Sequence, residues 1–455
     1  MPAQLLTGWG RTGATRAEVA APGSAEEIAD VLAGAGRRGV LARGLGRSYG
    51  DAAQNAGGTV VDTSALSSPL ELDGAGSLKV GAGVSLDTVM QTFIPLGWFV
   101  PVTPGTRQVT VGGAVAADVH GKNHHVDGSI GRHVSRMRLV SPTGVHELGP
   151  DDDLFWATVG GMGLTGVVTE VELRMTPIET STMLVDIDRT PDLDATMSLM
   201  AEGDEGYRYS VAWIDCLSTG RSLGRSVLTR GDHAPASALP GRRRDDPLAF
   251  SPRTRLAAPP WAPSSLLNSM SIRAFNEAWY RRAPRRERGA VHGLAGFFHP
   301  LDGVSGWNRL YGRRGFLQYQ FVLPFGQEDV LRRTVERLAG GGCPSFFGVL
   351  KRFGESDAGH LSFPVPGWTL ALDMPIGPPA LGPLLDALDA EVAAAGGRVY
   401  LAKDSRLRPE HLSAMYPRID EWRAVRDRVD PDGVMCSDLA RRLGLLAHSP
   451  GPGPL

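Results

Sequence analysis

Cysteine is scarce in this 455-residue chain, and long apolar runs are missing. The three cysteines, Cys216, Cys343 and Cys436, lie far apart and form no C-x-x-C pair, so the sequence predicts neither a disulfide framework nor a zinc site. No stretch approaches the ~18 apolar residues of a membrane span, and Met1–Gly10 lacks the pattern of a signal peptide. We therefore expect a protein that is cytoplasmic or peripherally associated with a membrane.

An excess of charge of either sign is also missing, since the formal net charge is −2. This balance disfavours nucleic acid as a partner. With 42% hydrophobic and 21% charged residues, the composition is typical of a globular protein. The chain exceeds the ~250–300 residues at which a single core stops growing, so we expect two domains.

Lysine is unusually rare among the 47 basic residues, of which all but four are arginine. The four are Lys79, Lys122, Lys351 and Lys403. A lysine in so arginine-biased a chain indicates a position that needs a compact ammonium group rather than a planar guanidinium fork. These lysines are therefore candidates for a functional site.

The order of predicted elements changes near Thr176. Before it, short helical and strand patterns alternate at residues 24–35, 40–42, 59–62, 78–80 and 85–93, and glycine clusters in loops at 43–58, 105–113 and 160–166. After it, longer strands are predicted at 207–214 and 316–323, and helices at 328–339 and 379–395. This second region is typical of an α+β domain with one large sheet.

The stretch Pro240–Arg288 is rich in proline and holds eleven arginines against four acids. One interpretation is a solvated, mobile loop. The other is a basic flap whose Leu256, Trp261, Leu266 and Leu267 contact an anionic membrane surface. The final ~55 residues could complete the first domain, with a frayed end at Ala447–Leu455.

Two glycine-rich loops carry the chemistry of the first domain. Arg43–Gly50 follows an apolar run, where a turn can offer successive N–H groups to a pyrophosphate. It matches neither G-x-G-x-x-G nor the Walker pattern, so a nicotinamide-binding Rossmann fold is not predicted. The second loop, Pro104–Gly113, leads into Ala114, Ala116 and Ala117, small residues that suit a backbone packed against a planar ring.

Histidines follow directly, as His120, His124 and His125. The H-x-x-x-H spacing could place two imidazoles on one helix face. Gly121 and the absence of an acid on that face argue against a metal, so no metal site is predicted.

These loops, with Asp51, Gln54-Asn55 and Phe155–Gly166, resemble the FAD-binding domain of the vanillyl-alcohol-oxidase superfamily. More narrowly, Gly8–Thr12, Phe316–Phe321, Ala402–Arg406 and Met415–Arg418 are similar to its decaprenylphosphoryl-ribose oxidases. The motifs span nearly the whole chain. The resemblance implies a two-domain α+β flavoprotein, with an FAD-binding domain at 1–180, a substrate-binding domain with a large antiparallel sheet at 181–397, and a segment at 398–455 that returns to the first domain.

The resemblance implies FAD as the cofactor. Many superfamily members tether the flavin through a histidine at the position of Arg47, and a guanidinium is a poor nucleophile, so we expect noncovalent FAD, with His120 as the alternative tether. The residues expected to bind FAD are Ala42, Arg43, Gly44, Leu45, Gly46, Arg47, Ser48, Tyr49, Gly50, Asp51, Ala52, Gly105, Thr110, Val111, Gly112, Gly113, Ala117, Asp118, Val119, His120, Val168 and Tyr400.

The resemblance also implies a substrate site on the sheet of the second domain. Lys403, Tyr49 and Gln320 are the expected catalytic residues, with Lys403 supplying positive charge. The expected substrate-binding residues are Gln318, Lys351, Trp213, His120, Lys122 and Thr369. Gln318 and Gln320 should share one sheet face because strand side chains alternate. Ala371 stands where mycobacterial members have cysteine, and Phe298 stands where the family has tyrosine.

The implied activity is oxidation of the 2-hydroxyl of a polyprenylphosphoryl ribofuranose to a 2-keto intermediate, in arabinan synthesis for the cell wall. The substrate is a lipid-linked sugar phosphate, and a separate NADH-dependent keto-reductase would complete the epimerisation. Two alternatives stay open: an aldonolactone or alditol oxidase of the same superfamily, and a flavin-free scaffold that partners the reductase.

Overall fold

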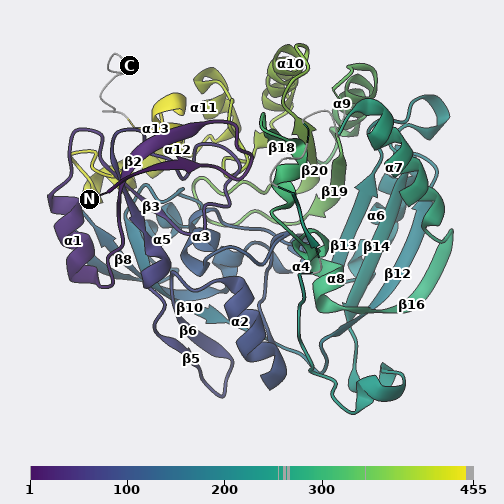
Figure 1. The fold of residues 1–455 in the computed structure, drawn as a ribbon, viewed down its shortest axis with the longest axis horizontal. Helices are drawn as coiled ribbons and strands as arrows, with labels where there is room; N and C mark the ends of the chain where they lie inside the picture. Colours follow the sequence, from purple (N-terminus) through teal and green to yellow (C-terminus); the bar gives the residue numbers. More distant parts are fainter. Residues whose placement is uncertain (1, 255, 260–262, 264–266, 344, 447–455) are drawn as a thin grey trace.

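A computed structural model describes residues 2–254, 256–259, 263, 267–343 and 345–446 of the chain. Within these residues, two smaller sheets built from residues 3–174 lie beside one large sheet built from residues 182–399 (Figure 1). The predicted α+β fold with a large antiparallel sheet is confirmed.

The first sheet has the strand order β1-β2-β4-β3. Its strands are β1 (Ala3–Thr7), β2 (Ala14–Ala20), β3 (Val40–Arg43) and β4 (Thr59–Asp62). Helix α1 (Ala25–Ala33) starts where the Ser24 side chain accepts a hydrogen bond from the Glu27 N–H, and it buries Ile28 and Leu32, which lie one turn apart. Because β3 ends at Arg43, the glycine-rich loop leaves the sheet directly at the edge that faces the large sheet.

The second sheet is antiparallel, with the order β5-β6-β10-β8-β9. Its strands are β5 (Leu70–Leu72), β6 (Ser77–Gly81), β8 (Val134–Ser141), β9 (Gly144–Leu148) and β10 (Val167–Arg174). The associated helices are α2 (Leu86–Phe93), α3 (Val111–Ala116), α4 (His124–Asp127) and α5 (Asp153–Thr158). Buried side chains of α2 and α3 pack with those of β6 and β10 in one core, which fixes the second glycine-rich loop against this sheet.

The large sheet is antiparallel at every pair, in the order β16-β12-β14-β13-β19-β20-β18-β21. Its strands are β12 (Thr182–Thr190), β13 (Tyr209–Ile214), β14 (Ser226–His233), β16 (Arg286–Gly293), β18 (Phe316–Pro324), β19 (Phe347–Phe353), β20 (Gly367–Pro375) and β21 (Arg398–Val399). Helices α6 (Leu193–Gly203), α9 (Glu328–Gly340) and α10 (Leu381–Ala394) pack on one face, where their leucines share a core with Leu228, Leu350 and Phe321. The opposite face is left to line a cavity.

Of the two interpretations of the Pro/Arg-rich stretch, the mobile loop is wrong for part of it. It holds helix α7 (Ser269–Arg282), whose Asn268 cap binds the N–H groups of Met270 and Ser271, and the start of β16. Strand β15 (Leu256–Ala257) pairs with β17 (Val304–Ser305), and β7 (Trp98–Phe99) pairs with β11 (Thr176–Pro177). Helix α8 (Leu294–Phe298) follows β16.

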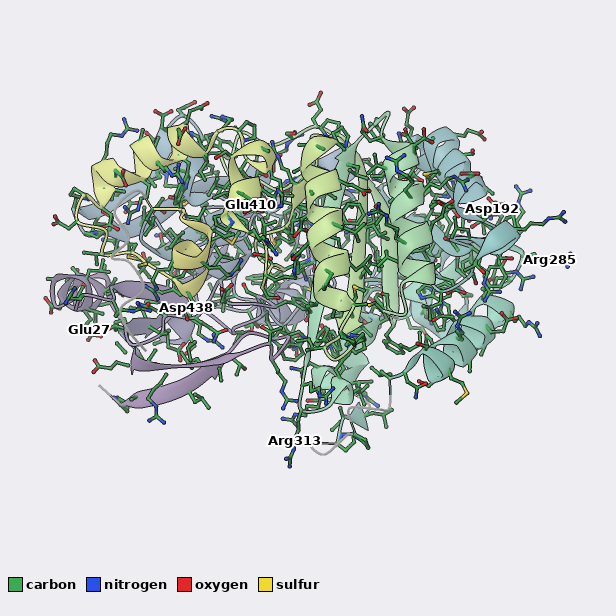
Figure 2. The ribbon with its side chains drawn as sticks, turned by 90° about the horizontal axis from the view of Figure 1, so that it is seen from above. Glu27, Asp192, Arg285, Arg313, Glu410 and Asp438 are labelled. Carbon is green, nitrogen blue, oxygen red and sulfur yellow. The ribbon has the colours of Figure 1, made fainter. Side chains whose placement is uncertain are left out.

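The last described segment contains α11 (Leu412–Met415), α12 (Ile419–Val429) and α13 (Asp438–Leu443). It lies beside the first sheet (Figure 1), where Met435 bridges to Val40 and the Ala56 N–H donates to Asp438. Seen from above, Glu27 of α1 and Asp438 of α13 lie at the end of the molecule opposite Arg285 (Figure 2).

Candidate active site

A cavity of about 1280 Å³ lies between the two glycine-rich loops and the open face of the large sheet. It exceeds the ~300–1,000 Å³ of an ordinary ligand pocket, as a site for a dinucleotide plus a second ligand should. Residues from all three sheets or their loops line it, including Gly44, Thr110 and Gln320.

The loop after β3 offers a row of backbone donors to this cavity. Residues 44–48 all line it, and within the described chain none of their N–H groups donates to a protein acceptor. The Arg43 guanidinium instead donates to the carbonyls of Ala53 and Thr7, which holds the loop open. Consecutive unpaired N–H groups suit the oxygens of a pyrophosphate.

The second loop supplies a close-packed, flat wall. Thr110 caps α3 by accepting from the Gly113 N–H, and a Cβ on Gly44 would lie 2.2 Å from the Thr110 hydroxyl. A Cβ on Gly112 would lie 2.9 Å from that of Ala82. Side chains are thus excluded where the two loops meet, and the residues present fit a flavin dinucleotide laid along them.

The lysines divide into two groups. Lys79 is exposed and paired with Glu170, whereas Lys122, Lys351 and Lys403 all line the cavity. The Lys79 ammonium lies 3.1 Å from Glu170, whereas no carboxylate of the described chain forms an ion pair with any of the other three. Burial lowers the pKa of Lys403 to about 8 and those of Lys122 and Lys351 to about 7. Unpaired cations in a cavity are costly unless a ligand compensates them.

His120 is held between two side chains of the large sheet. Gln320 Nε2 lies 3.0 Å from His120 Nε2, and Lys351 Nζ lies 3.1 Å from His120 Nδ1. Burial, and then the charge of Lys351, keeps the pKa of His120 well below its ordinary value, so the ring is neutral. Gln320 also donates to the Thr369 hydroxyl at 3.2 Å.

A second polar network surrounds Tyr49. Gln318 Nε2 donates to the Tyr49 hydroxyl at 3.3 Å and also to Asp373 Oδ1. The Lys403 ammonium lies 4.0 Å from the centroid of the Tyr49 ring, within cation–π range. Burial raises the pKa of Asp373 to about 7. Gln318 and Gln320 both face the cavity, which confirms the predicted shared sheet face.

Five of the expected site residues do not line the cavity, namely Gly50, Asp51, Val111, Asp118 and Thr369. Asp51 pairs with Arg442, and the Asp118 carboxylate accepts from the Ser362 hydroxyl and the Gly131 N–H. Their side chains therefore hold the loops in place. All the other expected residues line it, together with Ala371 and Phe298.

Asp373 is the principal cavity residue that sequence reasoning missed. The sequence did contain a signal for it, because Asp373 is the single acid in the apolar strand Gly367–Pro375. It lies four residues after Thr369 and therefore on the same face of the sheet. Phe275 and Trp279 of α7 were also missed.

The predicted helix face for His120 and His124 is wrong. Helix α4 begins only at His124, and His120 instead forms a bridge with Ser129. The described residues contain no group of three or more His, Cys, Asp or Glu arranged to hold a metal ion.

Of the four apolar residues expected on a membrane-facing flap, Leu256 is 68% exposed. Leu267 is not available, because it packs against the cluster of Tyr49, Trp307, Tyr311 and Phe316. Trp261 and Leu266 lie outside the described residues, as does the tail Ala447–Leu455. Across the described residues, every helix is too short or too polar to span a membrane.

The chain is similar to several known proteins. Residues 17–149 match the model of the FAD binding domain family, and residues 379–443 match that of D-arabinono-1,4-lactone oxidase. The chain is 47% identical over 450 residues, 97% of each protein, to decaprenylphosphoryl-β-D-ribose oxidase of Mycolicibacterium smegmatis. It is 25% identical, over 93% of its length and 94% of the relative, to L-gulono-1,4-lactone dehydrogenase of Mycobacterium tuberculosis.

A shorter match, 29% identical over 38% of this chain and 42% of the relative, is to alditol oxidase of a Streptomyces species. The cofactor is FAD, and the protein is an FAD-dependent oxidoreductase of the vanillyl-alcohol-oxidase superfamily. Identity at this level along nearly its whole length places the chain in the decaprenylphosphoryl-β-D-ribose oxidase family.

Proposed function

We propose that the chain oxidises the 2-hydroxyl of a polyprenylphosphoryl β-D-ribofuranose to a 2-keto sugar. The observation that carries this proposal is the convergence of Lys403, Gln318, Gln320 and Asp373 on one wall of a cavity that also has a long apolar part. The proposal is supported by the similarity to the Mycolicibacterium relative, which is a decaprenylphosphoryl-β-D-ribose oxidase.

Bound FAD would accept the hydride from C2 of the sugar. We assign to Asp373 the role of accepting the hydroxyl proton. Among the described cavity residues only Asp373 and Glu287 are acidic, and Glu287 lies on β16, at the far edge of the sheet. Tyr49 and Gln320 orient the hydroxyl, and Lys403 provides positive charge near the reacting atoms.

The site residues fall into a cofactor side and a substrate side. The loops at 42–49 and 105–119 would hold FAD, with Val168 and Tyr400 at its edge. Gln318, Lys351, Trp213, His120 and Lys122 would face the sugar phosphate. The division into an FAD-binding part (1–180), a substrate-binding part (181–397) and a returning segment (398–455) is supported by the sheet order and by the contacts of Met435 and Asp438.

The test is the visible spectrum of the anaerobic protein on addition of farnesylphosphoryl ribose. We expect the flavin band to bleach and a keto sugar to form in equal amount. A flavin that farnesylphosphoryl ribose does not reduce, while free aldonolactones or alditols do, would favour the second candidate, a lactone or alditol oxidase. That candidate is supported by the match of residues 379–443.

We propose that the FAD is noncovalent. The Arg47 guanidinium lies 3.9 Å from the centroid of the Trp9 ring, and no nucleophile stands at its position. Acid precipitation should leave the yellow colour in the supernatant, and colour retained in the pellet would point to a tether at His120.

We also propose two partners. The keto product requires an NADH-dependent reductase to complete epimerisation. An anionic membrane is the second, supported by the exposed side chains of Arg282, Arg285 and Arg286. Arg285 lies at the end of the molecule opposite Glu27 (Figure 2). The protein should float with anionic liposomes at low salt and sediment without them; no flotation would remove the membrane proposal.

A further inference from the structure

We propose that the apolar part of the cavity is a trough for the prenyl chain of the lipid-linked substrate, formed by one face of the large sheet beneath α7. This inference rests on the proposed function and adds the place where the chain lies. It also fixes the direction in which the substrate enters.

The floor of the trough is one straight row across five strands. Val227 on β14 stands opposite Trp213 on β13, which stands opposite Val349 on β19. Val349 stands opposite Ala371 on β20, and Ala371 opposite Gln320 on β18. All five line the cavity. Since neighbouring strands lie ~4.8 Å apart, the row is about 19 Å long.

Polarity changes along this row. Gln320 belongs to the polar wall beside His120, whereas the residues from Ala371 to Val227 are apolar apart from the indole N–H of Trp213. Ile187 and Val211 widen the floor on the same face, and both stand opposite Thr229. The trough therefore leads away from the reaction site as a surface suited to hydrocarbon.

Helix α7 forms the roof at the outer end. Phe275 and Trp279, one turn apart, line the cavity with 39% and 47% of their surfaces exposed. The helix is fixed to the sheet by Asn276 donating to Asp215 at 2.8 Å and by Tyr280 donating to the Thr190 carbonyl at 3.1 Å. Aromatic side chains held open in this way present a preformed apolar surface.

Two cations line the cavity beside the trough. Lys351 lies two residues after Val349 on β19, the middle strand of the row, and its Nζ is 3.1 Å from His120 Nδ1, next to the polar end of the row. Arg282, the last residue of α7, lines the outer end. A sugar at Gln320, a phosphate at Lys351 and a chain running beneath α7 would match this order of polar, cationic and apolar surface.

The test compares two substrates, farnesylphosphoryl ribose and ethylphosphoryl ribose, by their kcat/KM for flavin reduction. In the natural protein the farnesyl compound should be favoured strongly. The variant Val227→Trp fills the trough and should lower this preference by at least about tenfold, because losing the burial of two methylene groups has that effect.

The matched control is Val145→Trp, the same substitution at a 48% exposed position on β9. It should keep the preference of the natural protein. If the natural protein reduces its flavin equally well with both compounds, or if Val227→Trp keeps the full preference, the trough proposal is wrong.

A second variant, Trp279→Asp, serves if Val227→Trp fails to bind FAD or if its circular dichroism spectrum shows that it is misfolded. The Trp279 side chain is half-exposed and lies outside the core, so its substitution should not disturb folding. It should lower the same preference, and an unchanged preference would overturn the proposal. Failure of both compounds to reduce the flavin of the natural protein would instead reject the proposed function.

Discussion

Lys403 and Asp373 stand in one network, linked through Tyr49 and Gln318. Both are buried, so each has lost part of the hydration that stabilises its charge, and each gains from the opposite charge of the other. Each charge therefore favours the charged form of the other.

Lys403→Met should lower the rate of flavin reduction by at least about 100-fold while FAD stays bound, because one preorganised charge near the reacting atoms is removed. Stopped-flow absorbance with farnesylphosphoryl ribose measures this rate. Lys79→Met, at the exposed Glu170 pair, is the matched control and should be unaffected. If the flavin of Lys403→Met is reduced as fast as that of the natural protein, Lys403 takes no part in the reaction.

Asp373→Asn should change the pH profile as well as the rate. A proton acceptor must be ionised, and the Asp373 pKa of about 7 predicts loss of activity as the pH falls through 7. The Lys403 pKa of about 8 predicts a second loss as the pH rises through 8. In Asp373→Asn this loss of activity at low pH should disappear, and the rate of flavin reduction should fall ~100-fold or more.

The matched control is Glu287→Gln, because Glu287 is the other acid that lines the described cavity. This variant should still lose activity as the pH falls through 7. If Asp373→Asn also loses activity as the pH falls through 7, a group other than Asp373 accepts the hydroxyl proton.

At the scale of elements, helix α13 holds the first glycine-rich loop in place. Arg442 forms two parallel hydrogen bonds of 2.8 Å with Asp51 and an ion pair with Asp404, which lies in the loop after β21. The C-terminal segment thus connects the pyrophosphate loop with the segment that carries Lys403.

Arg442→Ala should lower the free energy of unfolding by about 2–3 kcal/mol and weaken FAD binding, because Asp404 would be left buried without its partner. This expected loss of stability is smaller than for a fully buried ion pair, because the Arg442 and Asp51 side chains are 25% and 22% exposed. Thermal unfolding and FAD titration measure both effects.

Arg428→Ala, which removes a 3.6 Å pair with Asp153 between side chains that are 63% and 75% exposed, should change neither quantity measurably. Equal effects of the two substitutions would show that the Arg442 network is unimportant.

For the whole molecule, FAD would add contacts between two parts of the chain, because residues such as Gly44 and Gln320 line the same cavity. A ligand present at ~1,000 times its Kd stabilises the folded state by about 4 kcal/mol. The apoprotein should therefore unfold roughly 5–10 °C below the holoprotein, and its Tm should rise with added FAD.

Riboflavin, which lacks the phosphates that the loop at 44–48 would bind, should restore less of this stability than FAD. A Tm that is independent of FAD concentration would contradict a cofactor site shared between the sheets.

Local pattern was enough to predict much of the first domain. The helix within 24–35, the strand at 59–62 and the two glycine-rich loops appear where the sequence indicated, because helical periodicity, turns and alternation act over a few residues. Helix α7 was missed because its proline- and arginine-rich surroundings resemble a loop.

The residues alone were enough to recognise the family and to place Gln318 and Gln320 on one face of the sheet. The packing of the sheets was needed to learn which lysines converge, that Asp373 joins them, and that Val227 continues the row that begins at Gln320. Alternation along a strand specifies the face of a side chain but says nothing of which strand lies beside it. Some neighbours in this sheet, such as Trp213 and Val349, come from positions more than a hundred residues apart, and their pairing is set by packing of the whole core.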